Sequence, residues 1–169
     1  TMAYQLLELA NLKNDQIVWK EQEISRLFQY IKTTLHNKII EKEIKIEFIY
    51  EMDIVWGDAC LLESLLVNLV DNAIKACSKG GHIIIRAAVE NGKKMICIRD
   101  DGKGMTAEVL NHITEPFYRA EKSRNHNDSG AGLGLAICKQ IALCHNAELK
   151  FISHPGEGTT VKITFTTSK

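Results

Sequence analysis

The spacing of hydrophobic residues predicts two amphipathic helices in the first half of the chain. From residue 21 to residue 36, apolar side chains recur every three or four positions, which places them on one helical face. A longer helix is predicted from Asp58 to about Cys77, because the Asp58 carboxylate can accept hydrogen bonds from the free amides of the first turn. Each helix should cover a sheet with its apolar face. The apolar positions are Ile24, Leu27, Phe28, Ile31, Leu35, Leu62, Leu66, Leu69, Val70 and Ala73.

Runs of apolar and alternating residues predict the strands of that sheet. Two such runs flank Asn91-Gly92, the strongest short signal for a β-hairpin. The last two runs are joined by a turn at residues 155–158, which contains Pro and Gly. The six predicted strands span residues 44–50, 54–56, 82–90, 93–100, 148–153 and 160–166.

Shorter segments complete the predicted fold. A short helix should follow Thr106 over residues 107–113, and another should begin after glycines and span residues 133–145. Residues 119–131 are polar and without periodicity, which predicts a mobile loop, whereas residues 1–15 resemble the end of a helix. The mixed order of helices and strands predicts an α/β (α+β) two-layer sandwich, in which helices cover one face of a mixed sheet.

Composition narrows the possible functions. The 169 residues fit one domain. The 21 basic residues balance 21 acidic ones, so the chain has no net positive charge that would favour nucleic acid as a partner. The five cysteines are odd in number, lie mostly in apolar runs and form no C-x-x-C pair, which predicts reduced core residues in the cytoplasm. No residues complete a metal site with Cys144 and His145. No apolar run approaches the roughly 18 residues of a membrane span, so we expect no direct membrane contact by this chain.

Polar residues on the long helix are the first candidates for chemistry. Asn68, Asn72 and Lys75 are separated by four and three residues, so they share one stripe opposite the leucine face. Amide oxygens can bind a hard cation that phosphates also hold, and the ammonium can bind a phosphate oxygen. A solvated helix face explains the same pattern when it is taken alone.

Three glycine-containing segments follow. Residues 100–104 (Asp-Asp-Gly-Lys-Gly) come directly after a predicted strand, so a carboxylate and a tight turn lie at its end. Residues 130–135 (Gly-Ala-Gly-Leu-Gly-Leu) open a helix, where free amides can bind phosphate, but they match neither the P-loop nor the dinucleotide fingerprint. Residues 156–159 (Gly-Glu-Gly-Thr) and the first segment are also ordinary turn sequences.

In order along the chain, these segments resemble the nucleotide-binding boxes of two-component sensor histidine kinases, in the superfamily of gyrase-type topoisomerases and heat-shock chaperone ATPases. The resemblance covers almost the whole chain, and four boxes in the right order are specific. It implies that residues 1–15 are the end of a dimerisation helix and a linker, and that residues 16–169 are the catalytic ATP-binding domain with a mobile ATP lid. The boxes are Asn68-x-x-x-Asn72-Ala73-x-Lys75, Asp100-x-Gly102-x-Gly104, Gly130-x-Gly132-Leu133-Gly134-Leu135 and Gly156-x-Gly158-Thr159.

The resemblance also implies roles for single residues. Asn72 would ligate Mg²⁺, Asp100 would bind the adenine amino group, Lys75 would contact phosphate, and Asn68 would support the site. Residues 115–119 resemble the family's phenylalanine box. Thr114 and Ala76 stand where that family usually has aromatic residues. The other residues expected at ATP are Gly102, Gly104, Met105, Phe117, Tyr118, Arg119, Lys122, Arg124, Gly130, Gly132, Leu133, Gly134, Leu135 and Thr160.

Asn68 also bears on the type of reaction. ATP-hydrolysing members of the superfamily usually have a glutamate four residues before the magnesium asparagine, and an amide cannot deprotonate water. Asn68 at this position favours phosphoryl transfer to another protein. None of the six histidines is followed by Glu or Asp, as the phosphoacceptor of these kinases is.

The sequence is therefore interpreted as a protein-histidine kinase catalytic domain. It should bind Mg-ATP and phosphorylate a histidine on the dimerisation and histidine phosphotransfer domain of its parent, for relay to a response regulator. We expect the isolated domain to be monomeric and cytoplasmic, and the parent to be a homodimer with or without a membrane anchor. Two alternatives stay open: an ATPase that drives conformational change, and a silent nucleotide sensor.

Overall fold

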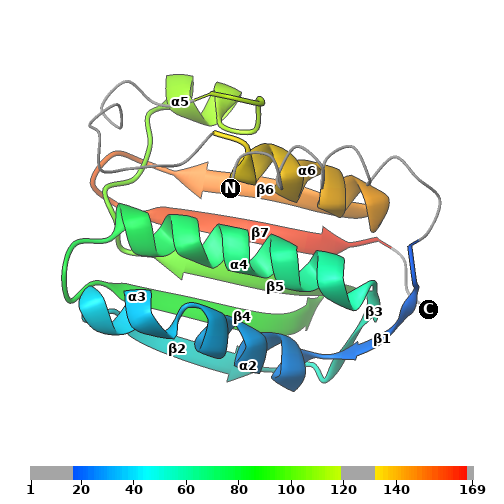
Figure 1. Ribbon diagram of the computed structural model, residues 1–169. Coiled ribbons are helices and arrows are strands. Elements are labelled where there is room, and N and C mark those ends of the chain that lie inside the picture. The colour runs from blue at the N-terminus through cyan, green and yellow to red at the C-terminus, as the bar shows by residue number, and fades with distance from the viewer. Residues whose placement is uncertain (1–16, 119–131, 167–169) are drawn as a thin grey trace.

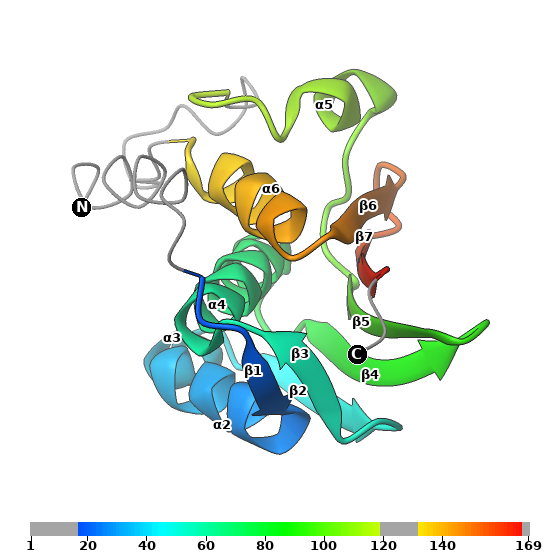
Figure 2. The ribbon, with the colours of Figure 1, turned by 90° about the vertical axis from the view of Figure 1, so that its right-hand side faces the viewer.

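Helices cover one face of a mixed five-stranded sheet in this computed structural model, which describes residues 17–118 and 132–166 (Figures 1 and 2). The strand order is β2-β4-β5-β7-β6, and only the β2–β4 pair is parallel. No helix within these residues is both long and apolar enough to span a membrane. The strands are β1 (Lys20–Glu23), β2 (Lys45–Tyr50), β3 (Ile54–Gly57), β4 (His82–Glu90), β5 (Lys93–Asp100), β6 (Ala147–Ser153) and β7 (Thr159–Phe165). The helices are α2 (Ile24–Thr34), α3 (His36–Glu41), α4 (Ala59–Ala76), α5 (Ala107–His112) and α6 (Gly134–Cys144).

The predicted two-layer arrangement is confirmed, and the β4–β5 hairpin has the predicted ends. Asn91 and Gly92 both have positive φ, 51° and 75°, as the two central residues of a tight hairpin turn require. Pairing in this hairpin sets Ile83 opposite Asp100. The aspartate therefore lies at the end of a central strand, beside the helix layer.

The first predicted helix differs from the observed structure at both ends. Residues 20–23 form the short strand β1, which pairs antiparallel with β3, so that Lys20 lies opposite Gly57. The helix α2 begins only at Ile24, and Leu35 leaves the helical conformation before α3 starts. The sequence of β1 is polar and carries no strand signal of its own. The strand forms because it pairs with β3.

The core lies between α2, α4, α6 and the inner face of the sheet, and every apolar helix position predicted above is buried. The prediction that the cysteines are core residues is wrong for three of the five. Cys77 and Cys138 are buried, but Cys60 is exposed, and Cys97 and Cys144 are partly exposed. Cys97 lies opposite Arg86 and Lys162 on the outer face of the sheet, because side chains alternate along a strand.

Asp58 joins three parts of the chain at the start of α4. As predicted, its carboxylate caps the helix: Oδ1 accepts the Leu61 N–H at 3.2 Å. Its Oδ2 accepts the Val18 N–H at 3.0 Å, and its own N–H donates to His145 Nε2 at 3.0 Å. His145 is 1% exposed, and its Nδ1 donates to the Ile141 carbonyl at 2.8 Å. Burial lowers the pKa of His145, so this imidazole is neutral with its proton on Nδ1.

Candidate nucleotide-binding site

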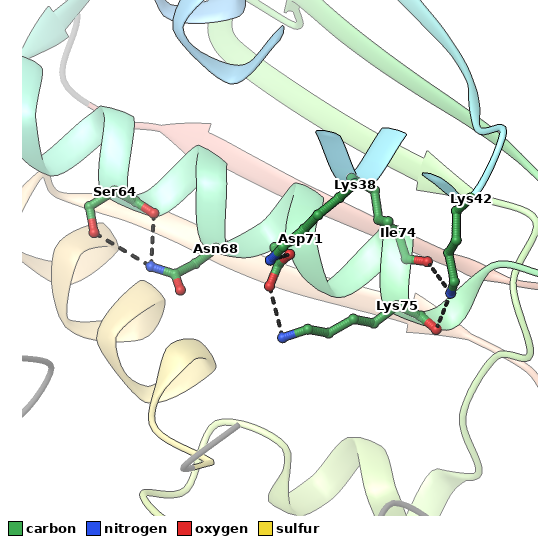
Figure 3. Close-up of polar contacts among 7 residues, drawn as sticks. All are labelled: Lys38, Lys42, Ser64, Asn68, Asp71, Ile74 and Lys75. Carbon is green, nitrogen blue, oxygen red and sulfur yellow. Dashed lines mark hydrogen bonds and ion pairs between the residues drawn. The ribbon is translucent and has the colours of Figure 1, made fainter. Parts of the chain in front are cut away.

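The central part of α4 carries two asparagines, Asn68 and Asn72, with different surroundings. Figure 3 shows the contacts of Asn68. Asn68 Nδ2 donates to the Ser64 carbonyl at 2.9 Å, which orients this amide. A Cβ atom built on Gly134 would lie 3.2 Å from Asn68 Oδ1, so the start of α6 lies directly against Asn68. The Asn72 side chain makes no hydrogen bond to the residues that the structure describes, and it is partly exposed. Its oxygen is therefore available to a ligand.

Lys75 lies beside Asp71, one turn back on α4. The Lys75 Nζ to Asp71 Oδ2 distance is 2.8 Å, and Asp71 Oδ1 is bound by Nζ of Lys38 from α3. Burial raises the pKa of the Asp71 carboxyl, but the two ammonium groups lower it by more, so the net shift is downward. Asp71 is thus a carboxylate with two cationic partners from two helices.

The C-terminal end of α4 is fixed by a lysine and by the first glycine segment. Lys42 Nζ donates to the carbonyls of Ile74 at 2.8 Å, Lys75 at 3.1 Å and Cys77 at 2.8 Å, which are among the free acceptors of a helix end. The Lys103 N–H donates to the Ala76 carbonyl at 3.1 Å. The stripe of polar side chains on α4 and the predicted Asp-Gly segment are therefore held together.

Asp100 is the buried carboxylate of the site, with 5% exposure. Its Oδ1 accepts the N–H groups of Gly102 at 2.9 Å and Thr159 at 3.2 Å. No described residue donates to Oδ2. Burial raises the pKa of Asp100, and the neighbouring Asp101 raises it further, while the two backbone bonds lower it. One oxygen thus holds the loops and the other remains for a ligand donor.

The first and third glycine segments meet backbone to backbone. A Cβ atom at Gly104 would lie 1.9 Å from the His154 carbonyl oxygen, and one at Gly158 would lie 2.0 Å from the Asp100 carbonyl oxygen. Both glycines also have positive φ, 63° and 80°. The Met105 N–H donates to Ser153 Oγ at 2.9 Å, which adds β6 to the same junction. These contacts require residues without a side chain at both positions.

The end of the α5 segment meets the second glycine segment. The Phe117 N–H donates to the Gly132 carbonyl at 2.9 Å, and the Tyr118 ring lies 5.5 Å from the His112 ring between centroids. Leu133 is 1% exposed and belongs to the core, so any contact of Leu133 with a ligand would come from its backbone. Leu135 is partly buried against the same core.

A family model described as "Histidine kinase-, DNA gyrase B-, and HSP90-like ATPase" matches residues 57–169. The chain belongs to this family. The matched range holds α4, the β4–β5 hairpin and all three glycine segments, so the elements that form the site described above lie within the family's ATPase domain.

Within this ATPase family, the similar proteins are sensor histidine kinases, and the chain is an ATP-binding domain of that type. Sensor histidine kinase YkoH of Bacillus subtilis (strain 168) is 36% identical over 162 residues, which cover 95% of this chain and 35% of YkoH. The Acinetobacter baumannii histidine kinase AdeS superposes with a TM-score of 0.78 and 19% identity, covering 98% of this chain and 77% of that one. Histidine kinase ThkA in complex with response regulator protein TrrA gives a TM-score of 0.77 and 21% identity, covering 97% and 46%.

Not every residue expected at ATP lies at this site. Thr160 lies opposite Arg99 on the outer face of the sheet, away from the helices, because it is one position out of phase along β7. Thr159 takes its place: it is buried, and its N–H is bonded to Asp100. The sequence contained a signal for Thr159, because it is the threonine of the Gly-x-Gly-Thr segment. Four further expected residues, Arg119, Lys122, Arg124 and Gly130, lie outside the described residues.

Proposed function

We propose that this chain binds Mg-ATP and transfers the γ-phosphoryl group to a histidine on the dimerisation and histidine phosphotransfer domain of its parent protein, for relay to a response regulator. The observation that carries the proposal is the presence of an amide, Asn68, at the position of the catalytic glutamate of hydrolysing enzymes. In the position where a hydrolysing enzyme needs a base, this chain has an amide whose nitrogen is bonded to the Ser64 carbonyl. Such a group can hold ATP without activating water.

The roles we propose follow the contacts of each side chain. Asp100 Oδ2 accepts the adenine amino group, since Oδ1 is already bonded to two backbone amides. Lys75 binds a phosphate oxygen, and the first amides of α6, beside Asn68, bind phosphate at the positive end of that helix. Gly102 and Gly104 let the base approach the backbone, and Met105 and the Phe117–Tyr118 segment border it. The basic residues Arg119, Lys122 and Arg124 are proposed phosphate contacts on sequence grounds alone.

The donor groups of the site suit Mg²⁺. The Asn72 oxygen is a neutral, hard ligand without a hydrogen-bond partner among the described residues. Within residues 17–118 and 132–166, no group of three or more His, Cys, Asp or Glu residues is placed to hold a metal. Mg²⁺ commonly takes one or two protein ligands and completes its octahedron with phosphates and water. Bound between Asn72 and the phosphates, it would neutralise the charge of the transferred group.

The proposed reaction needs positioning more than acid–base chemistry. An imidazole nitrogen of the acceptor histidine donates its electron pair to form a bond with the γ-phosphorus. The bond from phosphorus to the bridging oxygen breaks, and ADP leaves with the electron pair of that broken bond. Asp100 fixes the base at one end, and Lys75 and the start of α6 fix the phosphates at the other end. This chain then supplies orientation and positive charge at the transferred group.

Residues 16–169 form the catalytic domain in this proposal, and residues 1–15 form the end of the dimerisation helix and a linker, in a homodimeric parent. The chain spans 35% of the length of YkoH, which leaves room for further domains in a parent of that kind. ThkA is known in complex with the response regulator TrrA, which supports a response regulator as the final acceptor. The catalytic domain is proposed to act in the cytoplasm.

The test is phosphorylation in trans with γ-labelled ATP. The chain is incubated with Mg-ATP, with and without the separately produced dimerisation domain of its parent, while free phosphate is measured in parallel. We expect label on the added domain, no label on this chain, and little phosphate release. Transfer should be slow, because the tether that raises the local concentration of the acceptor is missing. Fast phosphate release without acceptor would establish the ATPase alternative, and ATP binding without transfer would establish the nucleotide sensor.

A further inference from the structure

A second lysine, Lys38, lies outside the predicted nucleotide-binding boxes and is connected to Lys75 through the Asp71 carboxylate. Lys38 lies on α3, and its ammonium binds one oxygen of Asp71, whose other oxygen binds Lys75 (Figure 3). Asp71 lies one turn before Lys75 on α4, so this carboxylate shares a helix face with the proposed phosphate ligand. The three charged groups form one cluster, contributed by two helices.

We propose that Lys38 and Asp71 are positioning residues for Lys75: Asp71 holds the Lys75 ammonium in place, and Lys38 neutralises Asp71 so that Lys75 keeps its attraction for phosphate. The proposal rests on the phosphate-binding role of Lys75 given above. It assigns a function to Lys38, which lies in none of the predicted boxes.

The charge count explains why one lysine would not be enough. A carboxylate paired with Lys75 alone would form a neutral pair, and the same carboxylate would repel an incoming triphosphate. With Lys38 on the other oxygen, two positive charges surround one negative charge, and the cluster keeps a net charge of one. The Asp71 side chain is only 17% exposed, so water screens these interactions less than at an open surface.

The geometry also separates the two lysines by role. The Lys75 side chain runs back along α4 to Asp71, whereas Lys38 reaches Asp71 from α3 (Figure 3). Each ammonium has its own carboxylate oxygen, Oδ1 for Lys38 and Oδ2 for Lys75. The Lys75 ammonium has three donors, so it can bind a phosphate oxygen while Asp71 Oδ2 still holds it. A buried carboxylate that lost both partners would be costly.

The main test compares Lys38→Met with Lys79→Met. Lys79 is a matched control, because it carries the same charge and is paired with Glu43 at 2.9 Å, away from Asp71. Lys38→Met should weaken Mg-ATP binding about three- to tenfold, as expected when a partly buried carboxylate loses one of two ionic partners. Adenosine binding, followed by NMR titration, should stay unchanged because adenosine has no phosphate. Lys38→Arg should restore ATP affinity, and Lys79→Met should change neither ligand. ATP affinity that is equal in the wild type and Lys38→Met would overturn the proposal.

A double-mutant cycle tests whether Lys38 acts through Asp71. In an Asp71→Asn background, Lys38→Met should no longer weaken ATP binding, because the negative charge that Lys38 neutralises is gone. An undiminished loss in that background would show direct contact with phosphate and would also overturn the proposal. Failure of the proposed function is a separate result: the wild type would then bind no ATP, or Lys75→Met would bind it as well as the wild type.

Discussion

The Thr159 N–H donates to Asp100 Oδ1 at 3.2 Å, although the two residues are 59 positions apart in the chain. The Gly102 N–H donates to the same oxygen at 2.9 Å. One carboxylate oxygen therefore joins two loops, and the second oxygen is left for a ligand. The two functions of Asp100 can be separated by mutation, because an amide side chain has one oxygen and one nitrogen.

Asp100→Asn should keep the fold and weaken adenine nucleotide binding. The amide oxygen can accept the N–H groups of Gly102 and Thr159, while the NH₂ group replaces the oxygen proposed to accept the adenine amino group. The expected loss of binding free energy is about 1.5–3 kcal/mol, typical of a hydrogen bond to a charged group. Calorimetric titration with a non-hydrolysable ATP analogue measures the loss. Asp101→Asn is the matched control and should bind normally. An unchanged dissociation constant for Asp100→Asn would remove this residue from the site.

Gly158→Ala should be far more damaging than Gly156→Ala, although both glycines have φ near +80°. A Cβ atom at Gly156 would meet nothing within 4 Å, so only backbone strain of about 1–2 kcal/mol is expected. At Gly158 the same atom would lie 2.0 Å from the Asp100 carbonyl oxygen, which adds overpacking and brings the expected cost to about 2–5 kcal/mol. Urea unfolding of both variants tests this order. Equal losses would mean that the two loops can separate without cost.

Asn72→Ala should abolish magnesium-dependent nucleotide binding, whereas Asn68→Ala should have a smaller effect. The Asn72 amide has no hydrogen-bond partner among the described residues, while the Asn68 amide is bonded to the Ser64 carbonyl and lies against Gly134. The first is therefore proposed to bind the metal and the second to support the site. Titrations of ATP with and without Mg²⁺ distinguish the two roles. Identical losses in both variants would contradict this assignment.

His145 should make the fold less stable at mildly acidic pH. Burial lowers the pKa of His145 in the folded state below its usual value of 6.5, so the unfolded chain takes up the proton first. The stability that the fold gains from keeping His145 neutral is fully present above about pH 7.5. It is lost as the pH falls below 6.5, by up to about 1.4 kcal/mol per pH unit.

The matched measurement uses His145→Asn and His112→Asn, which replace a buried and an exposed histidine. Urea unfolding at pH 7.5 and pH 5.5 gives the loss of stability for each protein. The loss should be smaller in His145→Asn than in the wild type, because the buried titrating group is gone, and it should stay unchanged in His112→Asn. If both variants lose as much stability as the wild type, His145 does not control this pH dependence.

The sequence predicted best those elements whose signals are local. Asn91-Gly92 specifies its turn through the backbone preferences of two adjacent residues, and both strand ends of that hairpin were predicted correctly. The apolar face of α4 follows from helical periodicity, and the Asp58 cap follows from a preference of the first turn. In each case neighbouring residues carry all the information that is needed.

What the sequence did not predict depends on distant contacts. The strand β1 exists because it pairs with β3, more than thirty residues later along the chain. The buried role of His145 depends on Asp58, 87 positions away, whose backbone N–H donates to the His145 Nε2 atom. Thr159 and Thr160 are adjacent, so the strand pattern alone does not tell which of them faces the helices, and the pairing of β7 with β5 decides this. The Lys38–Asp71 pair likewise spans 33 positions.

The three bonds of Asp58 have a mechanical consequence. Val18, the first turn of α4 and the end of α6 all attach to this one residue, two of them through the carboxylate and one through its backbone N–H. The backbone at Val18 is therefore connected to both helices through one residue, by contacts that do not involve the sheet. The helix α4 carries Asn68 and Asn72, and α6 begins at Gly134 directly against Asn68, so both helices border the proposed phosphate end of the site. Loss of the Asp58 carboxylate would remove two of the three bonds and leave only the backbone bond to His145.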